Sequence, residues 1–203
     1  IYKGYNPDWF KDITPFNFCS IGIPKNSIVV AFAGSNTKNK RISDFIKSSQ
    51  YLSTEKEVHY IIFGKDTIDT GLEKYKKESP IKNNIHILGL RTDAISLIKG
   101  SNLYVQTSLS EGVGRAISEA MSVGKPIIMT DAGGCTELID ESCGIITPTR
   151  NPEAVGKAIS SLVNNDELRL QMGINAQKRI EKVYHIHDTV EDKMELYKQL
   201  LKQ

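Results

Sequence analysis

Two carboxylates and two glycines stand close together near the middle of this 203-residue chain. Glu111 directly precedes the Gly112 to Gly114 turn. Glu119 follows Glu111 after seven intervening residues. Glycine lets a backbone bend closely around a bound group, and the amides at a helix start point toward an anion, so this pattern indicates a phosphate site. Carboxylates repel phosphate but accept hydrogen bonds from sugar hydroxyls, which predicts a diphosphate bound between two sugars.

A strand, a loop and a helix should position these residues. Residues 103–107 form a short β-rich run that leads into the polar loop. A helical pattern begins near Gly114, because apolar residues then recur at spacings of three and four. These apolar residues are Ile117, Ala120 and Met121. The glycine turn therefore falls between a strand end and a helix start.

Other interpretations of this stretch stay open. Arg115 and Glu119 are four residues apart and could form only an exposed ion pair on a helix. A dinucleotide-binding fold would place a ribose-binding acid about 20 residues after the glycine turn, where Asp131 stands at a strand end. Against that reading, Ile117 occupies the place of the third glycine. An NAD(P)-dependent oxidoreductase domain stays an alternative, as does a non-catalytic module that binds nucleotides or carbohydrates.

The central stretch also resembles a known family. Ser-Leu-Ser-Glu-Gly-Val-Gly-Arg, which ends at Arg115, and Glu-Ala-Met-Ser-Val-Gly-Lys-Pro, which starts at Glu119, are similar to the signature of retaining GT-B glycosyltransferases. The similarity is to the group 1 family, also called GT4, and it continues through residues 126–139 and 144–148. It covers most of the chain and implies the C-terminal, donor-binding half of a GT-B fold.

The resemblance implies how a nucleoside-diphosphate sugar would be held. Glu119 would accept hydrogen bonds from the ribose hydroxyls, and Leu90 and Arg91 would lie beside the nucleobase. Glu111 would lie near the hydroxyls of the transferred sugar. With Lys40, Glu111 is an expected catalytic residue. Neither a metal nor another cofactor is implied.

The diphosphate site is where this sequence departs from the family pattern. The residues expected to bind the diphosphate are Lys40 and the backbone of Gly112, Val113 and Gly114. Gly34 and Lys40 match the family, but Ser35 stands where relatives carry an arginine. We hypothesise that Arg41 or Arg115 replaces this arginine. Three cations in one loop at a strand end could neutralise a leaving diphosphate.

Strands that alternate with helices predict an α/β fold with a doubly wound, Rossmann-like parallel sheet and ligand sites at the carboxyl ends of its strands. The run at residues 27–33 is almost wholly apolar, which is typical of a strand covered on both faces. The expected strands are residues 27–33, 58–64, 84–88, 103–107, 126–130 and 144–147. Helices are expected after residue 41, over 70–78, through Ile95 and Ile98, from Gly114, within 132–139, after Asn151, and over 166–183 and 187–201.

Local signals give more specific expectations at the helix ends. Asn151, followed by proline, should cap its helix. Thr92 could cap the helix that follows it, and Thr136 or Glu137 could cap the short helix after residue 132. Tyr51 continues the apolar spacing of the helix after residue 41, so it is expected to point inward.

Composition argues against several classes of protein. The 26 basic and 24 acidic side chains give a net charge of +2, so nothing indicates a nucleic-acid or polyanion partner. No apolar run approaches about 18 residues, and no signal-peptide pattern is present. Three cysteines without a CxxC spacing predict buried thiols in a reducing cytosol: Cys19, Cys135 and Cys143. Four scattered histidines are expected to be packed or at the surface rather than metal ligands: His59, His86, His185 and His187.

The chain divides into three expected parts. Residues 1–18 read as an interdomain connector, residues 19–183 as the nucleotide-sugar-binding domain, and residues 184–203 as a terminal crossover helix. The chain starts at Ile1 rather than Met, so we expect a fragment that lacks its N-terminal acceptor domain and is inactive alone. The expected setting is cytoplasmic, in bacterial polysaccharide or glycolipid synthesis. The basic, amphipathic last helix could instead contact a membrane surface in the full-length protein.

Overall fold

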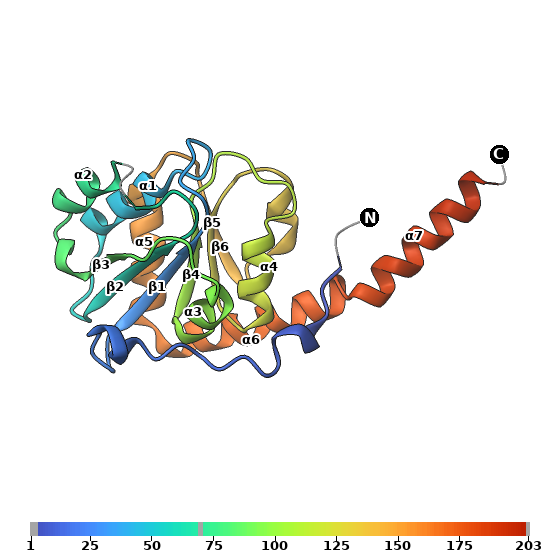
Figure 1. Cartoon of the computed structure of the whole chain (residues 1–203), viewed down its shortest axis with the longest axis horizontal. Coiled ribbons are helices and arrows are strands. Elements are labelled where there is room, and N and C mark those ends of the chain that lie inside the picture. Colours follow the sequence, from blue (N-terminus) through green and yellow to red (C-terminus); the bar gives the residue numbers. More distant parts are fainter. Residues whose placement is uncertain (1–3, 69–70, 202–203) are drawn as a thin grey trace.

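The structure, a computed structural model, describes residues 4–68 and 71–201. Six parallel strands form one sheet in the order β3-β2-β1-β4-β5-β6 (Figure 1). The strands are β1 Ile28–Ala33, β2 Val58–Phe63, β3 Ile85–Ile87, β4 Leu103–Gln106, β5 Ile127–Thr130 and β6 Gly144–Thr147. All six predicted strands are present, and the doubly wound parallel sheet is confirmed. The strand order reverses between β1 and β4, which therefore flank the switch point of the fold.

Helices cover both faces of the sheet. Helices α1 Ile42–Ser48, α2 Leu72–Lys77 and α5 Pro152–Asn164 lie on one face. Helices α3 Ala94–Gly100 and α4 Arg115–Ser122 lie on the other (Figure 1). Helix α6 Asp166–Val183 contributes Met172 to the first half of the core and Ala176 and Ile180 to the second. Short 3-10 helices span Pro7–Phe10, Phe18–Ile21, Ser49–Tyr51, Lys82–Asn84 and Gly134–Leu138. The helix predicted over residues 70–78 is the shorter α2, and Thr70 lies outside the described residues.

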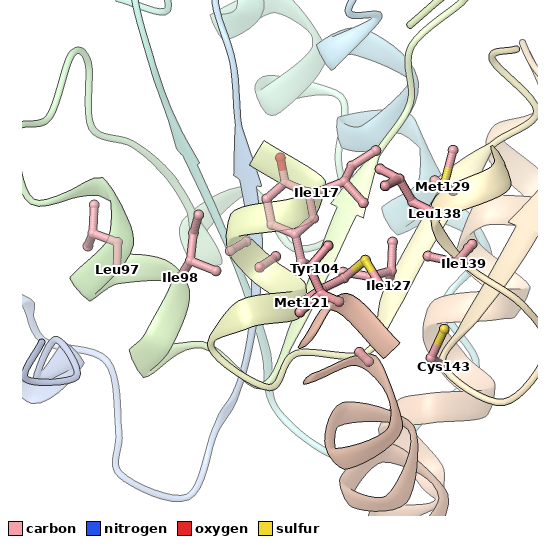
Figure 2. Close-up of a cluster of buried hydrophobic side chains, with 14 of the residues drawn as sticks. Leu97, Ile98, Tyr104, Ile117, Met121, Ile127, Met129, Leu138, Ile139 and Cys143 are labelled. Atoms are coloured by element: carbon pink, nitrogen blue, oxygen red, sulfur yellow. The ribbon is translucent and has the colours of Figure 1, made fainter. Parts of the chain in front are cut away.

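Successive residues of each central strand enter opposite halves of the core. In β1, Val30 and Phe32 pack with α1 and α5, whereas Val29 and Ala31 pack with α3 and α4. This alternation follows from the two-residue period of a strand. Figure 2 shows the half of the core that lies against α3 and α4, in which Tyr104 of β4 lies among aliphatic side chains of α3, α4 and β5. The apolar run is therefore buried on both faces, as predicted.

Helix ends were predicted with mixed success. The Asn151 side chain accepts a hydrogen bond from the Ala154 amide at 3.0 Å, so the predicted cap of α5 is confirmed. The prediction for Thr92 was wrong, because Asp93 holds the N-cap position of α3 and makes no side-chain cap bond. The 3-10 helix at residues 134–138 starts after Gly133, and its Thr136 hydroxyl donates to the Gly133 carbonyl instead of capping.

Two burial predictions were also wrong. Tyr51 is 42% exposed, because α1 ends at Ser48 and a 3-10 turn carries the chain out of the helical period. Cys19 lies exposed in the 3-10 helix at residues 18–21. Cys135 and Cys143 are buried thiols, as expected.

The last helix, α7 Ile186–Leu200, projects away from the sheet (Figure 1). It begins beside the N-terminal segment, where the Tyr5 amide donates to the Tyr184 carbonyl and the Ile186 amide donates to the Tyr5 carbonyl. Its apolar residues Val190, Met194 and Tyr197 are each more than half exposed. Among the described residues, this face therefore has little apolar surface packed against it. No helix in the described part of the chain combines the length and apolarity needed to cross a bilayer.

Candidate functional site

The predicted acid and lysine meet at the switch point of the sheet. Lys40 comes from the loop after β1, and Glu111 comes from the loop after β4. The Lys40 Nζ atom lies 2.5 Å from the Glu111 Oε1 atom, and the two side chains are 25% and 12% exposed. Partly buried charges are screened less than surface charges, so this pair sets the local electrostatics at the carboxyl edge of the sheet.

Hydrogen bonds join the two loops that carry this pair. The Asn39 side chain donates to the Ser110 carbonyl at 2.7 Å and accepts from the Ser110 amide at 3.1 Å. The Leu109 amide donates to the Asn39 carbonyl at 2.8 Å. The buried Thr107 hydroxyl donates to the Arg41 carbonyl at 2.9 Å. The position of Lys40 relative to Glu111 is thus fixed by the backbones of both loops.

A chain of buried hydrogen bonds ends on the Glu111 carboxylate. The Tyr104 hydroxyl donates to Gln106 Oε1 at 2.7 Å, and Gln106 Nε2 donates to Ser108 Oγ at 2.8 Å. The Ser108 hydroxyl then donates to Glu111 Oε1 at 2.5 Å. Each donor in the series points toward the acid, so the series holds the carboxylate in one orientation.

Sequence reasoning did not identify Tyr104, Gln106 and Ser108 as site residues. A signal was available, because Tyr104 and Gln106 alternate with apolar residues along β4, and Ser108 continues this alternation into the loop that follows. Polar groups in such positions need hydrogen-bond partners, and partners that run toward a strand end indicate a site there.

The glycine turn begins directly after Glu111 and leads into α4. Gly114 is the N-cap of α4 and has a left-handed backbone with φ of 60°, which favours glycine. The Glu111 amide donates to the Ala132 carbonyl at 2.7 Å. A Cβ atom on Gly134 would lie 3.0 Å from the Gly112 carbonyl oxygen, so the glycines of the two turns allow close approach. The predicted strand, glycine loop and helix start are all present.

Glu119 lies on the first turns of α4, with its side chain 20% exposed. Its Oε1 atom lies 3.3 Å from Arg115 Nε, so the ion pair that we considered as a simpler interpretation does form. Arg115 itself is 76% exposed at the helix start. Burial, followed by the charges of Glu119 and Glu111, raises the pKa of the Tyr104 phenol. The glycine turn lies between the two acids in sequence.

The remaining predicted site residues are dispersed around this centre. Arg41 makes two 2.8 Å hydrogen bonds to the buried Asp44 of α1 rather than joining Lys40 at Glu111. Arg91 makes a similar pair with Asp93, and the neighbouring Leu90 is 75% exposed on the loop after β3. Leu90 and Arg91 stand at the same edge of the sheet as Glu111, but in the described part of the chain no hydrogen bond or ion pair joins either of them to it.

Gly34 and the buried cysteine complete the surroundings of the site. Gly34 follows β1, and a Cβ atom on Gly64 would lie 2.1 Å from its carbonyl oxygen, so the loops after β1 and β2 pack closely. Burial, followed by the charge of Glu111, raises the pKa of the Cys135 thiol to about 11. Cys135 is therefore a neutral packing residue at neutral pH rather than a nucleophile. Within the described residues, no three potential metal ligands of the His, Cys, Asp and Glu types converge.

The fold and the site define a class, namely Rossmann-like α/β proteins with a ligand site at the switch point of a parallel sheet. Residues 14–179 match the family model described as "Glycosyl transferases group 1". The chain belongs to this family of glycosyltransferases. The oxidoreductase alternative is accordingly not favoured.

Individual relatives agree with this assignment. The chain is 28% identical to the N,N'-diacetylbacillosaminyl-diphospho-undecaprenol alpha-1,3-N-acetylgalactosaminyltransferase of Campylobacter jejuni, over 77% of this chain and 41% of that protein. It is 24% identical to the capsular polysaccharide biosynthesis glycosyltransferase CapM of Staphylococcus aureus, over 88% of this chain and 48% of that protein. The chain thus spans about half the length of these curated relatives.

Solved structures share the fold. The crystal structure of Anabaena HepE in complex with UDP-glucose superposes with a TM-score of 0.84 at 21% identity, covering 100% of this chain and 57% of that one. A glycosyltransferase from Rickettsia africae superposes with a TM-score of 0.85 at 21% identity, covering 99% of this chain and 56% of that one. The described sheet and helices are therefore a GT-B-type half.

Proposed function

We propose that this chain is the donor-binding half of a retaining glycosyltransferase of the GT4 type, which transfers a sugar from a nucleoside-diphosphate sugar. The observation that carries the proposal is the Lys40–Glu111 pair at the switch point, directly beside the glycine turn. A cation, backbone amides at a helix start and a hydrogen-bonded carboxylate in one place suit a ligand that combines phosphate with hydroxyls.

Each residue has a distinct role in the proposal. The amides of Gly112 to Gly114 and the ammonium of Lys40 bind the diphosphate. Glu119 accepts hydrogen bonds from the ribose, and Leu90 with Arg91 lies beside the nucleobase. Glu111, oriented by Ser108, accepts hydrogen bonds from the transferred sugar.

The chemistry proposed for these residues is electrostatic. When the bond between sugar and phosphate breaks, negative charge grows on the leaving diphosphate, and groups already aimed at it stabilise the transition state more than the ground state. In the proposal, Lys40 and the glycine amides stabilise this charge, and no metal takes part. Since Arg41 is held by Asp44, Arg115 is the better candidate to replace the arginine that is missing at Ser35. Glu111 acts as a positioning and electrostatic group rather than as a nucleophile.

Names of the relatives and neighbours guide the choice of substrates. HepE is described in complex with UDP-glucose, which makes UDP the first nucleotide to test. The names of two relatives specify alpha-1,3 transfer to a sugar on diphospho-undecaprenol. An α-linked product from an α-linked donor means retention, and a lipid-linked acceptor suits bacterial polysaccharide or glycolipid synthesis in the cytoplasm, at the inner membrane face.

The proposal also assigns parts of the chain. Residues 1–18 connect to an acceptor-binding half, residues 19–183 bind the donor, and residues 184–203 form the helix that returns to the other half. Turnover then requires both halves, because the acceptor contacts lie outside this chain.

Calorimetric titration of the chain with UDP, GDP, ADP and UDP-sugars tests the proposal. One nucleoside diphosphate should bind, and Glu119→Ala should weaken its binding about tenfold or more, because charged hydrogen bonds to the ribose are lost. Glu153→Ala, which removes an exposed acid from α5, is the matched control. Arg115→Ala should weaken the binding of the nucleoside diphosphate more than it weakens the binding of the corresponding nucleoside. Binding of NAD in place of every nucleoside diphosphate would overturn the assignment.

A further inference from the structure

A second concave surface lies beside the proposed donor site. Its volume is about 680 Å³, and it is bounded by the loop after β1, by α1 and α2, and by the loops after β4 and β6. Neither Lys40 nor Glu111 lines it, although Arg41 and Leu109, their close neighbours in sequence, do. This basic pocket is therefore separate from the Lys40–Glu111 pair and uses the same two loops.

The basic pocket concentrates positive charge. Its cations are Lys38, Arg41 and Arg150, and none of the described residues that line it is an acid. The nearby acid, buried Asp44, is occupied by its two hydrogen bonds from Arg41. Within the described ranges, Lys38 and Arg150 take part in no ion pair. Two positive charges thus remain uncompensated in one hollow of a chain whose whole net charge is +2.

Arg41 and Arg150 both adopt a backbone conformation that arginine rarely takes. Arg41 has a φ of 51° and Arg150 has a φ of 56°, in the left-handed region that glycine and asparagine tolerate best. Strained non-glycine residues concentrate at functional sites, where the side chain is needed at that place. Two such arginines from different loops converge on this pocket.

We propose that the basic pocket binds a phosphate or diphosphate group that is distinct from the donor diphosphate. Lys38 and Arg150 supply charge-assisted hydrogen bonds, and the guanidinium of Arg41, held in place by Asp44, adds a fixed charge. The half-buried Tyr75 and Leu109 contact the part of the ligand next to the phosphate. The phosphate belongs either to a free anion or to an acceptor that carries it on an apolar group.

Titration with inorganic pyrophosphate tests this pocket separately from the donor site. In the Lys40→Gln variant, which impairs the donor site, pyrophosphate should still bind. Adding Lys38→Gln and Arg150→Gln to that variant should weaken this binding about tenfold or more, because two charged hydrogen bonds are lost. Arg41 is left unchanged, because its removal would leave the buried Asp44 without its partner.

The control variant carries Lys25→Gln and Lys178→Gln in the same Lys40→Gln background, which changes the net charge equally on other surfaces. It should bind pyrophosphate as the Lys40→Gln variant does. Equal affinity of the two triple variants, with unchanged unfolding midpoints, would overturn the proposal, whatever Glu119→Ala does to nucleotide binding. Adding Lys38→Gln alone to the Lys40→Gln variant repeats the test with one exposed side chain changed, and pyrophosphate should again bind more weakly.

Farnesyl diphosphate distinguishes the two sources of the phosphate. If it binds the pocket more tightly than pyrophosphate, and Leu109→Ser removes the difference, the ligand is a lipid-linked diphosphate. If the two bind equally, the ligand is a free anion. Failure of both to bind in the Lys40→Gln background would exclude the pocket as a phosphate site.

Discussion

At the scale of single residues, the Glu111 carboxylate depends on side chains that do not touch a substrate in the proposed mechanism. Ser108 is fully buried and links Gln106 to Glu111 by one donated and one accepted hydrogen bond. Removing a group in the middle of such a series leaves a buried donor without its acceptor. The cost of that loss exceeds the net value of an ordinary hydrogen bond.

Ser108→Ala should therefore lower the free energy of unfolding by about 1–3 kcal/mol, because the Gln106 amide loses its buried acceptor. Urea denaturation of the chain measures this change. Ser110→Ala, at an exposed hydroxyl in the same loop, is the control and should change the free energy of unfolding by less than about 0.5 kcal/mol. Ser108→Thr keeps the hydroxyl and should recover part of the loss. Equal free energies of unfolding for Ser108→Ala and Ser110→Ala would show that the hydrogen bonds of Ser108 do not stabilise the fold.

The sequence allowed Lys40 and Glu111 to be placed at the same edge of the sheet, because the carboxyl ends of parallel strands share one edge, but it did not predict the ion pair between them. It did not allow the partner of Arg41 to be predicted. Three cations stand within residues 38–41, and which of them reaches the acid depends on the left-handed turn at Arg41 and on the buried Asp44 beyond it. Such a choice is made by tertiary geometry rather than by residue type.

At the scale of elements, the strands were predictable because each one is an apolar run bounded by polar or glycine residues. Helix ends were less predictable, because competing local hydrogen bonds decide them. Asp93 holds the N-cap position of α3, yet its carboxylate is used by Arg91. Tyr51 follows the helical period in sequence, but the 3-10 turn after Ser48 rotates it out of the core.

One pair of histidines gives the sheet edge a dependence on pH. His59 of β2 and His86 of β3 lie with ring nitrogens 3.0 Å apart, and the other ring nitrogen of His59 lies 3.1 Å from Glu57. Burial, followed by the charges of His59 and Lys76, lowers the pKa of His86 below its ordinary value. The unfolded chain therefore takes up a proton on His86 at a higher pH than the folded chain does.

The free energy of unfolding should accordingly fall as the pH drops below about 6.5, the ordinary pKa of histidine. In His86→Gln this part of the dependence should be weaker. Denaturation midpoints of wild type and His86→Gln at pH 7.5, 6.5 and 5.5 measure this difference in pH dependence. All three pH values lie above the range in which carboxylates such as Asp93 titrate. His187→Gln, an exposed histidine on α7, is the control. Parallel curves for wild type and His86→Gln would contradict the expectation.

At the scale of the whole molecule, α7 carries apolar surface that the described domain does not cover. Val190, Met194 and Tyr197 are 51%, 52% and 58% exposed. The spacing in the sequence indicated that α7 is amphipathic, and the structure shows that its apolar face is directed away from the described domain. A sequence pattern gives the apolar face of a helix but not the body that the face meets.

Replacing Met194 and Tyr197 by lysine should leave the free energy of unfolding within about 0.5 kcal/mol of the wild type, because exposed side chains are changed. The same change should reduce self-association of the isolated chain at high concentration, since it removes an exposed apolar patch. Denaturation and sedimentation velocity measure the two effects. Lys193→Gln is the control on the same helix. A loss of more than about 1 kcal/mol would mean that this face packs against the domain.

The hydrogen bonds between Asn39 and Ser110 have one further consequence. They tie the loop after β1, which carries Lys40 and part of the basic pocket, to the loop after β4, which carries Glu111 and Leu109. A molecule that binds at one of these two sites and shifts the joined loops alters the affinity for a molecule at the other site. Thermodynamic reciprocity then requires that the second molecule alter the affinity for the first by the same factor.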